Sequence, residues 1–306
     1  MRVAGIDCGT NSIRLLVADA VDGRLVDVVR EMRIVRLGEG VDRTGQLLPA
    51  ALERTRGALA DYAATITEHG ADRIRMIATS ATRDAANRTD FLTMVHDVLG
   101  AEPEVISGAE EAALSFSGAA AGLPGIDGRL LVADIGGGST ELVLGEASAP
   151  NDLRSYSMDV GCVRMTERHL RDDPPTPEQV RATVDDLRAA LARAAAQVDI
   201  TTPATFVGLA GTVTTIAAIA LGLDHYDSEA VHGSVLSAAQ VHDVTARLLA
   251  MTHDERATLP VLHPGRVDVI GGGALVLRTL LEVSGANELI ASEHDILDGI
   301  ALSLVC

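Results

Sequence analysis

The stretch that decides the fold is Leu-Leu-Val-Ala-Asp-Ile-Gly-Gly-Gly-Ser-Thr-Glu-Leu-Val-Leu at residues 130–144. It repeats the pattern of Val-Ala-Gly-Ile-Asp-Cys-Gly-Thr-Asn-Ser-Ile-Arg-Leu-Leu-Val at residues 3–17. In both, an apolar strand ends in an aspartate, a turn of small residues follows, and a second apolar strand resumes. The two aspartates, Asp7 and Asp134, stand about one domain length apart in the sequence. The chain therefore has the pattern of a duplicated domain.

Each hairpin is followed by the same kinds of element. A third strand, at 24–36 in the first half and about 153–160 in the second, completes a meander. A helix is expected from Pro49 to His69, because proline stands in its first turn and Gly70 follows its end. The remaining expected elements are a strand at 73–79, a helix at 81–99, a short strand at 104–106, a helix at 109–121, a helix at about 177–198, and a strand at 205–209 with a turn at 208–212 that opens a helix.

A glycine-rich loop, Gly-Leu-Pro-Gly-Ile-Asp-Gly at 122–128, separates the two halves. We therefore expect one domain at 1–124 and a second at 125–293, with a C-terminal helix at 294–306 that packs back on the first. This α/β pattern resembles a pair of ribonuclease-H-like domains, the actin-like (ASKHA) superfold of actin, Hsp70 and the sugar kinases. In that fold the two domains would face each other across a cleft, with both glycine-rich hairpins pointing into it.

The composition excludes several classes of function. All 25 basic residues of the 306 are arginine, which excludes a P-loop lysine, a Schiff-base lysine and a pyridoxal-phosphate anchor. The formal net charge of −18 argues against a protein that binds nucleic acids or membrane surfaces in general. An anionic substrate would have to be bound by a local arginine cluster or a metal ion.

The cysteines and the apolar stretches indicate a cellular location. Cys8, Cys162 and Cys306 are far apart and form no CxxC pair, which favours a reducing compartment over a zinc site or a disulfide framework. The N-terminus becomes acidic at Asp7 and leaves no room for an apolar signal segment. The longest apolar stretches are too short for a membrane span. We therefore expect a cytoplasmic protein.

The triple-glycine turn at 136–138 has a chemical use as well as a structural one. Its N–H groups can approach a phosphate closely, and Ser139 and Thr140 add hydroxyl donors. Asp134 and Glu141 flank the turn and could hold a hydrated Mg²⁺ beside that phosphate. Taken alone, a tight hairpin without a ligand is the simpler interpretation. Repetition favours phosphate binding, because comparable turns contain Gly9, Thr10, Asn11 and Ser12, and Gly211 and Thr212.

Four motifs together resemble the exopolyphosphatase and guanosine pentaphosphate phosphohydrolase (Ppx/GppA) family. They are D-C-G-T-N-S at 7–12, S-G-A-E-E-A at 107–112, D-I-G-G-G-S-T-E-L at 134–142 and G-L-A-G-T at 208–212. Downstream segments similar to the family follow in the same order: G-C-V-R-M-T-E at 161–167, V-H-G at 231–233 and D-I-L-D-G at 295–299. The chain resembles the short, two-domain form of this family.

The resemblance implies roles for residues that have ordinary explanations in isolation. Glu110 and Glu111 would normally form a solvated helix start, but the second glutamate of S-G-x-E-E-A is the family's proposed general base, which here is Glu111. Arg83 would normally lie on the surface, and the family places an arginine there against phosphate. Weaker candidates for substrate contact are Arg14, Arg164 and His232, and Asp295 is expected to cap the last helix.

We therefore predict a Mg²⁺-dependent exopolyphosphatase, with Mn²⁺ as a substitute metal, that hydrolyses the terminal phosphoanhydride of inorganic polyphosphate, above all of short chains. Asp7, Asp134 and Glu141 would place metal and water, and the turns would hold phosphates. Glu111 would activate the attacking water.

Three other functions stay open at this point. A guanosine pentaphosphate (pppGpp) 5′-phosphohydrolase would use the same residues on another terminal phosphoanhydride. An ATP-dependent kinase of the same superfold is disfavoured by S-G-A-E-E-A, and a non-catalytic polyphosphate or nucleotide sensor is disfavoured by the presence of Glu111. The expected partners are inorganic polyphosphate or pppGpp and a second copy of the chain in a homodimer, without nucleic acid or membrane.

Overall fold

The computed structural model describes residues 1–123, 125–126, 128–149, 152–201 and 204–305. The chain divides into two compact units, Met1–Gly118 with Asp295–Cys306, and Ala119–His294. The sequence placed the change between halves after residue 124, which lies outside the described residues. In the structure the division falls after Gly118, inside a helix, so this helix contributes residues to both units.

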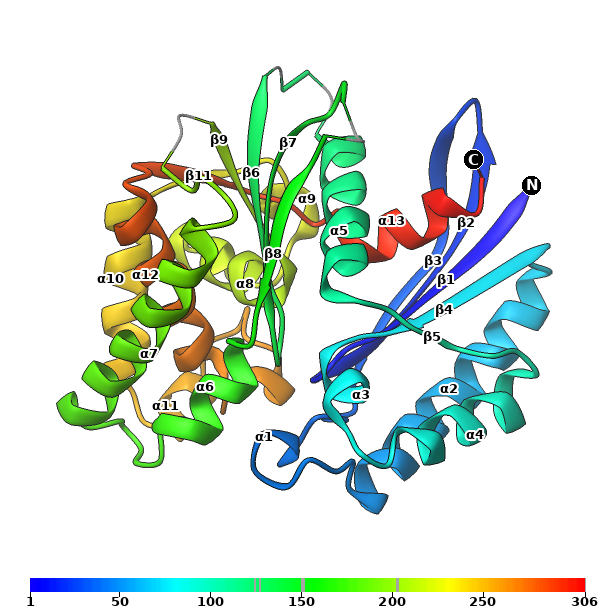
Figure 1. Ribbon diagram of the computed structural model, residues 1–306, viewed down its shortest axis with the longest axis horizontal. Coiled ribbons are helices and arrows are strands. Elements are labelled where there is room, and N and C mark those ends of the chain that lie inside the picture. Colours follow the sequence, from blue (N-terminus) through cyan, green and yellow to red (C-terminus); the bar gives the residue numbers. More distant parts are fainter. Residues whose placement is uncertain (124, 127, 150–151, 202–203, 306) are drawn as a thin grey trace. The chain divides into compact units, whose positions relative to one another are not determined.

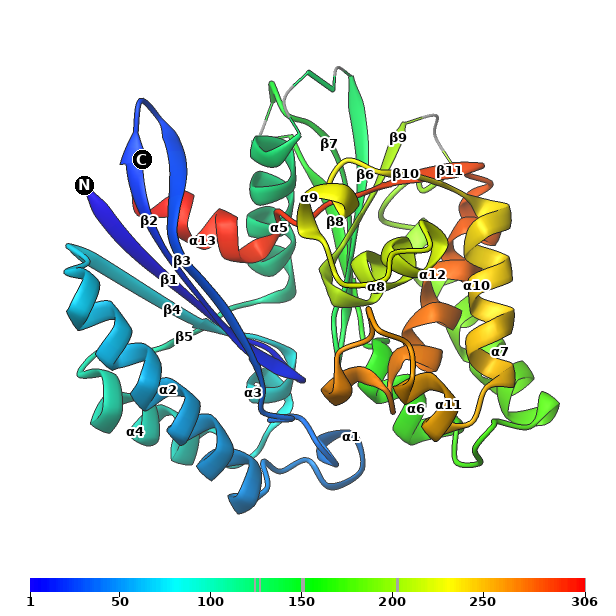
Figure 2. The ribbon, with the colours of Figure 1, turned by 180° about the vertical axis from the view of Figure 1, so that it is seen from behind.

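The first unit contains a five-stranded sheet in the order β3-β2-β1-β4-β5. Figure 1 and Figure 2 show α2 and α4 on one face of this sheet and α13 on the other. The elements are β1 (Arg2–Cys8), β2 (Ser12–Val21), β3 (Arg24–Ile34), α1 (Val41–Thr44), α2 (Pro49–His69), β4 (Arg73–Ala78), α3 (Ser80–Asp84), α4 (Arg88–Leu99), β5 (Glu104–Val105), α5 (Gly108–Gly122) and α13 (Ile296–Ser303).

Side chains along β1 and β2 point alternately to the two faces of the sheet, and they contribute to a hydrophobic core on each face. Ile6 and Leu15 belong to the cluster that includes Leu59 of α2 and Phe91 of α4. Residues of the opposite face, including Val3 and Leu16, pack against Leu297 and Ala301 of α13. Because successive side chains of a strand point to opposite faces, nearly continuous apolar strands are needed to supply both cores.

The second unit contains a six-stranded sheet in the order β10-β11-β9-β6-β7-β8. Its core joins Leu131 and Leu142 of the sheet to Leu191, Ile216 and Leu277 of the covering helices. The elements are β6 (Arg129–Ile135), β7 (Thr140–Glu146), β8 (Arg154–Met158), α6 (Cys162–His169), α7 (Pro177–Ala195), β9 (Thr205–Leu209), α8 (Ala210–Ala220), α9 (Ser228–Val231), β10 (Val235–Ser237), α10 (Ala238–Ala250), α11 (His253–Ala257), η1 (Pro264–Arg266), α12 (Ile270–Ser284) and β11 (Glu288–Ala291).

The two sheets have the same topology. The order β3-β2-β1-β4-β5 recurs as β8-β7-β6-β9-β11, with β10 added at the edge. In both, an antiparallel meander is extended by parallel strands, since β1 pairs parallel to β4 and β6 pairs parallel to β9. The duplicated ribonuclease-H-like, actin-like fold expected from the repeat is therefore confirmed.

The helix expected at 81–99 is two helices, α3 and α4, separated at Ala85–Asn87. Ala85 is extended, with φ −82° and ψ 129°. Asn87 anchors the break, because its side-chain Oδ1 accepts from the Leu47 N–H at 2.8 Å and its Nδ2 donates to the Leu47 carbonyl at 3.1 Å. This contact spans 40 residues of sequence, so the local helical pattern does not reveal it.

Helices α5 and α13 of the first unit approach each other at glycines. A Cβ added to Gly118 would lie 1.8 Å from the Asp295 carbonyl oxygen, and one added to Gly299 would lie 2.1 Å from the Leu114 carbonyl oxygen. Both obstacles are backbone atoms, which cannot move aside as a side chain can. Glycine at 118 and 299 therefore sets the distance between α5 and α13.

We predict that Gly118→Ala lowers the free energy of unfolding by several kcal/mol, because overpacking against backbone forces the helices apart. The control is Gly57→Ala in α2, where no atom lies within 4 Å of the added Cβ. That change should stabilise by about 0.5–1 kcal/mol, because alanine is the better helix former. Denaturant unfolding measures both, and equal effects at the two positions would contradict the packing argument.

Ala210, at the junction of β9 and α8, has a left-handed backbone with φ 66°. An L-residue with a Cβ is strained in this region, whereas glycine is not. We therefore predict that Ala210→Gly stabilises the fold, by up to about 1 kcal/mol. The matched control is Ala60→Gly in the middle of α2, which should destabilise by about 1 kcal/mol. A lower melting temperature in both variants would contradict the strain at Ala210.

Candidate active site

The first unit gathers its predicted site residues at one edge of the sheet. Strands β1, β4 and β5 run parallel, with Cys8 opposite Ala78 and Ala78 opposite Val105. Their carboxyl ends therefore meet at the same edge, where α/β proteins commonly bind ligands. The segments that leave this edge are the turn at 9–12, the start of α3, and the start of α5.

The turn at 9–12 is held from behind by the segment after β3. Gly9 N–H donates to the Ser12 carbonyl at 2.9 Å and closes the turn. The Asn11 carbonyl accepts from the N–H groups of Val35 and Arg36, at 3.0 and 2.9 Å, and the Thr10 carbonyl accepts from Gly38 N–H at 2.8 Å. The carbonyl oxygens are thus used inside the protein. Among the described residues, Thr10 Oγ1 is buried without a hydrogen-bond partner.

Asp7 precedes this turn and pairs with Arg14, its direct neighbour on β2. Arg14 Nε and Nη2 both donate to Asp7 Oδ2, at 3.0 and 2.6 Å. Asp7 Oδ1 is buried and has no hydrogen-bond partner among the described residues. Burial raises the pKa of the Asp7 carboxyl, and the Arg14 charge opposes this shift. Asp7 as a metal ligand stays a prediction.

The structure separates the two neighbouring glutamates of α5. Glu111 is 7% exposed and accepts from Arg83 Nη1 at 3.0 Å. The same Nη1 also donates to the Ile106 carbonyl at 3.0 Å, which fixes the guanidinium on the carboxylate. Glu110 points elsewhere and pairs with Arg75 at 2.9 Å, with 46% of its side chain exposed. Of the two glutamates, Glu111 is therefore the one that is buried at the sheet edge that carries the turn.

Arg83 retains donors for an anion. Its Nη1 is occupied by Glu111 and Ile106, whereas no acceptor in the described part of the chain bonds its Nε or Nη2. Its side chain is 25% exposed. A guanidinium can bind a carboxylate through one group and a phosphate through its others, because its five N–H donors form a planar fork.

In the second unit, the triple-glycine turn follows the same scheme. Gly136 N–H donates to the Ser139 carbonyl at 3.0 Å. The Gly136 carbonyl accepts from Cys162 N–H, and the Gly137 carbonyl accepts from Val163 and Arg164 N–H, at 2.9–3.1 Å. The start of α6 thus binds the carbonyl side of the turn. Because C=O and N–H of a trans peptide point in opposite directions, the N–H groups of Gly137 and Gly138 point away from α6.

Close packing makes this arrangement possible. A Cβ at Gly161 would lie 2.6 Å from the Gly137 carbonyl carbon and oxygen, so only glycine lets the α6 terminus reach the turn. Arg164, a weaker candidate for substrate contact, donates from Nε to the Gly138 carbonyl at 2.7 Å. Thr140, one of the predicted phosphate-binding residues, is fully buried, and its Oγ1 donates to the Val160 carbonyl at 2.7 Å.

Asp134 and Glu141 are direct partners on the antiparallel strands β6 and β7. Both are buried, at 6% and 1% exposure, and Glu141 Oε1 accepts from the Ser157 hydroxyl at 2.7 Å. Two carboxylates directly opposite each other favour a cation nearby. In the described residues no group of three or more His, Cys, Asp or Glu could hold a metal ion by itself. Two carboxylates suit Mg²⁺, which keeps water and phosphate oxygens as its other ligands.

The turn at 208–212 lies beside Asp134, because β9 runs parallel to β6 with Leu209 opposite Asp134. Gly211 and Thr212 form the first turn of α8, and Thr212 is 5% exposed. Arg266 was not predicted to lie here; its guanidinium carbon would lie 2.2 Å from a Cβ at Gly211. Arg266 precedes α12 by only a few residues but is far from Gly211 in sequence, so no motif links them.

His232 has a structural explanation. Its Nδ1 accepts from Glu293 N–H at 3.3 Å, so the proton of the neutral ring is on Nε2, which donates to the Gly122 carbonyl at 2.9 Å. The ring also meets the edge of His294, with 4.9 Å between centroids. Contact of His232 with a substrate stays a prediction.

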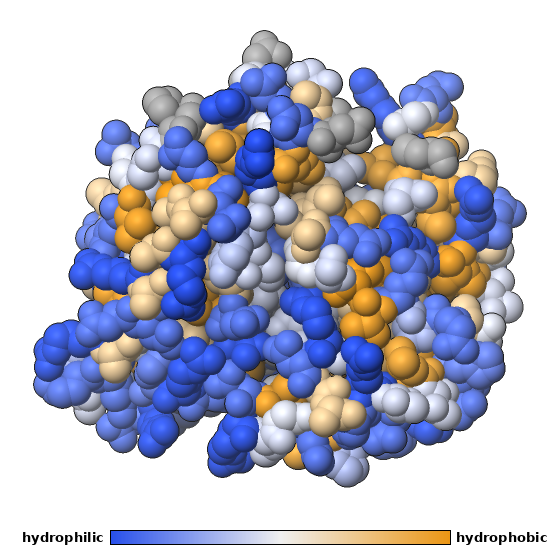
Figure 3. Space-filling model, viewed as in Figure 1, coloured by the Kyte–Doolittle hydropathy of each residue, from blue (hydrophilic) through white to orange (hydrophobic). Residues whose placement is uncertain are grey.

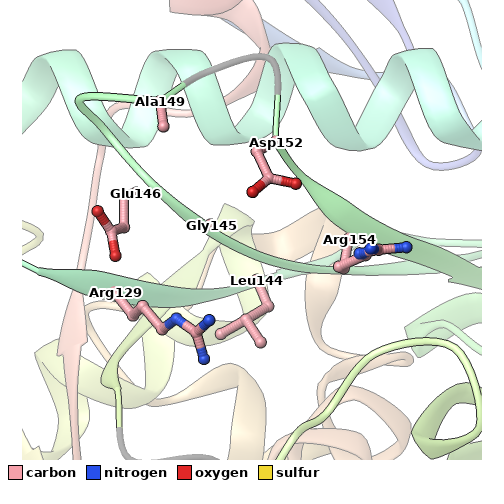
Figure 4. A pocket seen from close by; sticks show the side chains of 7 residues that line it. All are labelled: Arg129, Leu144, Gly145, Glu146, Ala149, Asp152 and Arg154. Atoms are coloured by element: carbon pink, nitrogen blue, oxygen red, sulfur yellow. The ribbon is translucent and has the colours of Figure 1, made fainter.

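A surface hollow of the second unit lies at the opposite end of the β6–β7 pair from Asp134 and Glu141 (Figure 4). Arg129 and Glu146 are direct partners at one end of the β6–β7 pair, whereas Asp134 and Glu141 are partners at the other. The hollow is lined by both positively and negatively charged side chains. Its lining residues are Arg129, Leu144, Gly145, Glu146, Ala149, Asp152 and Arg154. The face shown in Figure 3 is covered mainly by hydrophilic residues.

Comparisons with known proteins point to one family. The profile of the Ppx/GppA phosphatase family matches residues 16–305. Exopolyphosphatase 2 of Mycobacterium tuberculosis is 52% identical over 99% of this chain and 98% of its own length. A guanosine-5′-triphosphate,3′-diphosphate pyrophosphatase of Vibrio atlanticus is 30% identical over 99% of this chain and 59% of its own length.

Solved structures extend the likeness to the fold. The crystal structure of an exopolyphosphatase-like protein is 43% identical and superimposes with a TM-score of 0.95, covering 99% of this chain and 97% of that one. The family match covers almost the whole chain and includes both glycine-containing turns of the second unit, Arg83 and Glu111. The chain belongs to the Ppx/GppA phosphatase family.

Proposed function

We propose that the protein is an exopolyphosphatase, which hydrolyses the terminal phosphoanhydride of inorganic polyphosphate. The observation that carries the proposal is the ion pair of the buried Glu111 with the partly buried Arg83, 3.0 Å apart, at the sheet edge that also carries the 9–12 turn. The likeness to the exopolyphosphatase of Mycobacterium tuberculosis over almost the full length of both chains supports this substrate.

Each unit by itself has fixed donors to which we assign phosphate binding. The outward N–H groups of the 136–139 turn and the hydroxyl of Ser139 would hold one phosphate group. Arg83 Nε and Nη2 and the 9–12 turn, with the buried Thr10 hydroxyl, would hold another. A bound oxygen atom would satisfy Thr10 Oγ1, whose burial without a partner costs about 1–3 kcal/mol.

Glu111 is assigned the role of general base. It would accept a proton from a water molecule while the water oxygen attacks the terminal phosphorus in line with the bridging oxygen. The bond from phosphorus to that bridging oxygen breaks, and the products are orthophosphate and a chain shorter by one phosphate. Arg83 holds the Glu111 carboxylate in one orientation during this step.

Asp134 and Glu141 would hold Mg²⁺, with Mn²⁺ as a substitute, through carboxylate oxygens. When bound, the ion would neutralise phosphate charge next to the triple-glycine turn. Asp134 is fixed for this role by its position at the end of β6, and Glu141 by the Ser157 hydroxyl.

A guanosine pentaphosphate 5′-phosphohydrolase is the second candidate. It is favoured by the 30% identity to the Vibrio atlanticus enzyme, and it requires the same base, donors and metal. The two candidates differ only in what lies behind the terminal phosphoanhydride.

A cytoplasmic location is part of this proposal. Cys8 and Cys162 are buried free thiols, as expected in a reducing compartment. None of the described helices is both long enough and apolar enough to cross a membrane. The homodimer stays a prediction.

The proposal predicts phosphate release from polyphosphate that depends on a divalent metal. Orthophosphate should be measured with short polyphosphate, long polyphosphate, pppGpp and ATP as substrates, each with Mg²⁺, with EDTA, and with EDTA followed by Mg²⁺ or Mn²⁺. We expect the highest kcat/KM on short polyphosphate, loss of activity with EDTA, and recovery with either metal. Preference for pppGpp would select the second candidate, and full activity after chelation would refute the metal site.

A second prediction concerns Glu111. Glu111→Gln keeps the shape of the side chain but removes the basic lone pair, so kcat should fall by about 10²–10⁴. KM should change little, because the phosphate donors are intact.

Glu110→Gln is the matched control. It makes the same charge change one residue away, at an exposed pair with Arg75, so turnover should stay close to that of the wild type. Thermal melting of both variants separates catalysis from stability. Normal turnover in Glu111→Gln, or an equal loss in both variants, would remove Glu111 as the base.

A further inference from the structure

We propose that Asp295, at the start of α13, is a positioning residue that holds Arg14 on Asp7 and prevents Arg14 from binding substrate phosphate. The inference rests on the proposed function, since it assigns Asp7 a place beside the phosphate-binding turn. It gives the C-terminal helix a role in the site in addition to closing the core of the first unit.

Arg14 is bound at both ends of its guanidinium. Nε and Nη2 donate to Asp7 Oδ2, at 3.0 and 2.6 Å, and Nη1 donates to Asp295 Oδ2. Every nitrogen of the group therefore has a carboxylate partner. The plane of the guanidinium is fixed, and both of its hydrogen bonds to Asp7 hold Oδ2, while Asp7 Oδ1 has no hydrogen-bond partner among the described residues.

Asp295 is itself held in place by four independent contacts. Its Oδ1 accepts from Leu297 N–H at 2.9 Å, which caps α13, while Oδ2 is used for Arg14. Its own N–H donates to Asp298 Oδ2 at 3.0 Å, and its carbonyl lies against the backbone of Gly118. The side chain is 4% exposed. The carboxylate cannot rotate without losing the cap or the arginine.

The charge balance explains why a second carboxylate is useful. The charges of Asp295 and Asp7 raise the pKa of Arg14, against the effect of its burial, so the guanidinium stays charged. One guanidinium between two carboxylates leaves a net negative charge, which repels an incoming phosphate. Without Asp295, Arg14 would keep one partner and its Nη1 would be available to an anion.

The duplicated fold supports this interpretation. Arg14 stands opposite Asp7 in the first unit, and Glu141 stands opposite Asp134 at the same place in the second. The first unit thus carries its cation as a side chain. Such a cation needs an anchor if it is to stay on the aspartate when a polyanion binds nearby, and Asp295 supplies it.

The test compares Asp295→Asn with Asp298→Asn. Asp295→Asn retains an oxygen that can cap α13 but removes the negative charge that faces Arg14. Asp298 is also buried in the first turn of α13 and pairs with Arg30 at 2.6 Å. Asp298→Asn keeps an oxygen that can accept the Asp295 N–H and removes only the charge that faces Arg30, so it is the matched control. We expect kcat on polyphosphate to fall about 10–100-fold in Asp295→Asn with KM unchanged or lower, and to stay within about twofold in Asp298→Asn.

Two further variants guard against a folding defect. Asp295→Ser keeps a good capping residue without the charge and should reproduce the effect of Asp295→Asn. In an Arg14→Gln background, Asp295→Asn should add little to the loss, because the residue that Asp295 anchors is already absent. Additive losses of kcat in the double variant would overturn the proposal. So would losses of kcat that parallel the fall in melting temperature to the same extent in Asp295→Asn and in Asp298→Asn.

A binding measurement separates this proposal from the proposed function. Inorganic phosphate should raise the melting temperature of Asp295→Asn more than that of the wild type or Asp298→Asn, because Arg14 is released toward an anion. If the wild type failed to hydrolyse polyphosphate, the proposed function would fall and this comparison would still decide the role of Asp295. Equal shifts in all three proteins would refute it.

Discussion

The structure depends on the hydrogen bonds that hold the carbonyl side of the two glycine-containing turns. In the second unit, α6 supplies three N–H groups to the carbonyls of Gly136 and Gly137. In the first unit, the residues after β3 supply N–H groups to the carbonyls of Thr10 and Asn11. A turn whose carbonyl oxygens are bound by the protein presents its N–H groups outward, and outward N–H groups are what an anion requires. Glycine at 161 lets the start of α6 approach the triple-glycine turn closely enough for this.

The two copies of the turn have diverged at the residue that faces the aspartate. Asp7 faces Arg14, whereas Asp134 faces Glu141. An aspartate beside a guanidinium is a closed ion pair, and an aspartate beside a glutamate favours a cation from outside. One duplicated scaffold thus carries two different arrangements next to a glycine-containing turn, an aspartate paired with a fixed guanidinium in one unit and two facing carboxylates in the other. This difference follows from a single position of the repeat.

The sequence predicts the repeated hairpins and their aspartates well, because strand, turn and strand are encoded within 15 residues. Helix α2 begins and ends at the expected residues, Pro49 and His69, since proline and glycine mark both ends locally. Contacts between distant segments were not predictable from the pattern. The break before Arg88 depends on Leu47, the packing of Arg266 on Gly211 depends on two separate loops, and the double use of Asp295 as cap and ion-pair partner depends on β2.

Three arginines near the turns are held in place, which bears on how an acidic protein can act on a polyanion. Arg14 is bound by two aspartates, Arg83 by Glu111 and a carbonyl, and Arg164 by the Gly138 carbonyl. Since a guanidinium keeps its proton at any physiological pH, these charges are permanent as well as fixed. With a net charge of −18, the chain offers a polyanion no general attraction. Attraction of a polyanion would therefore have to come from these fixed donors next to the turns.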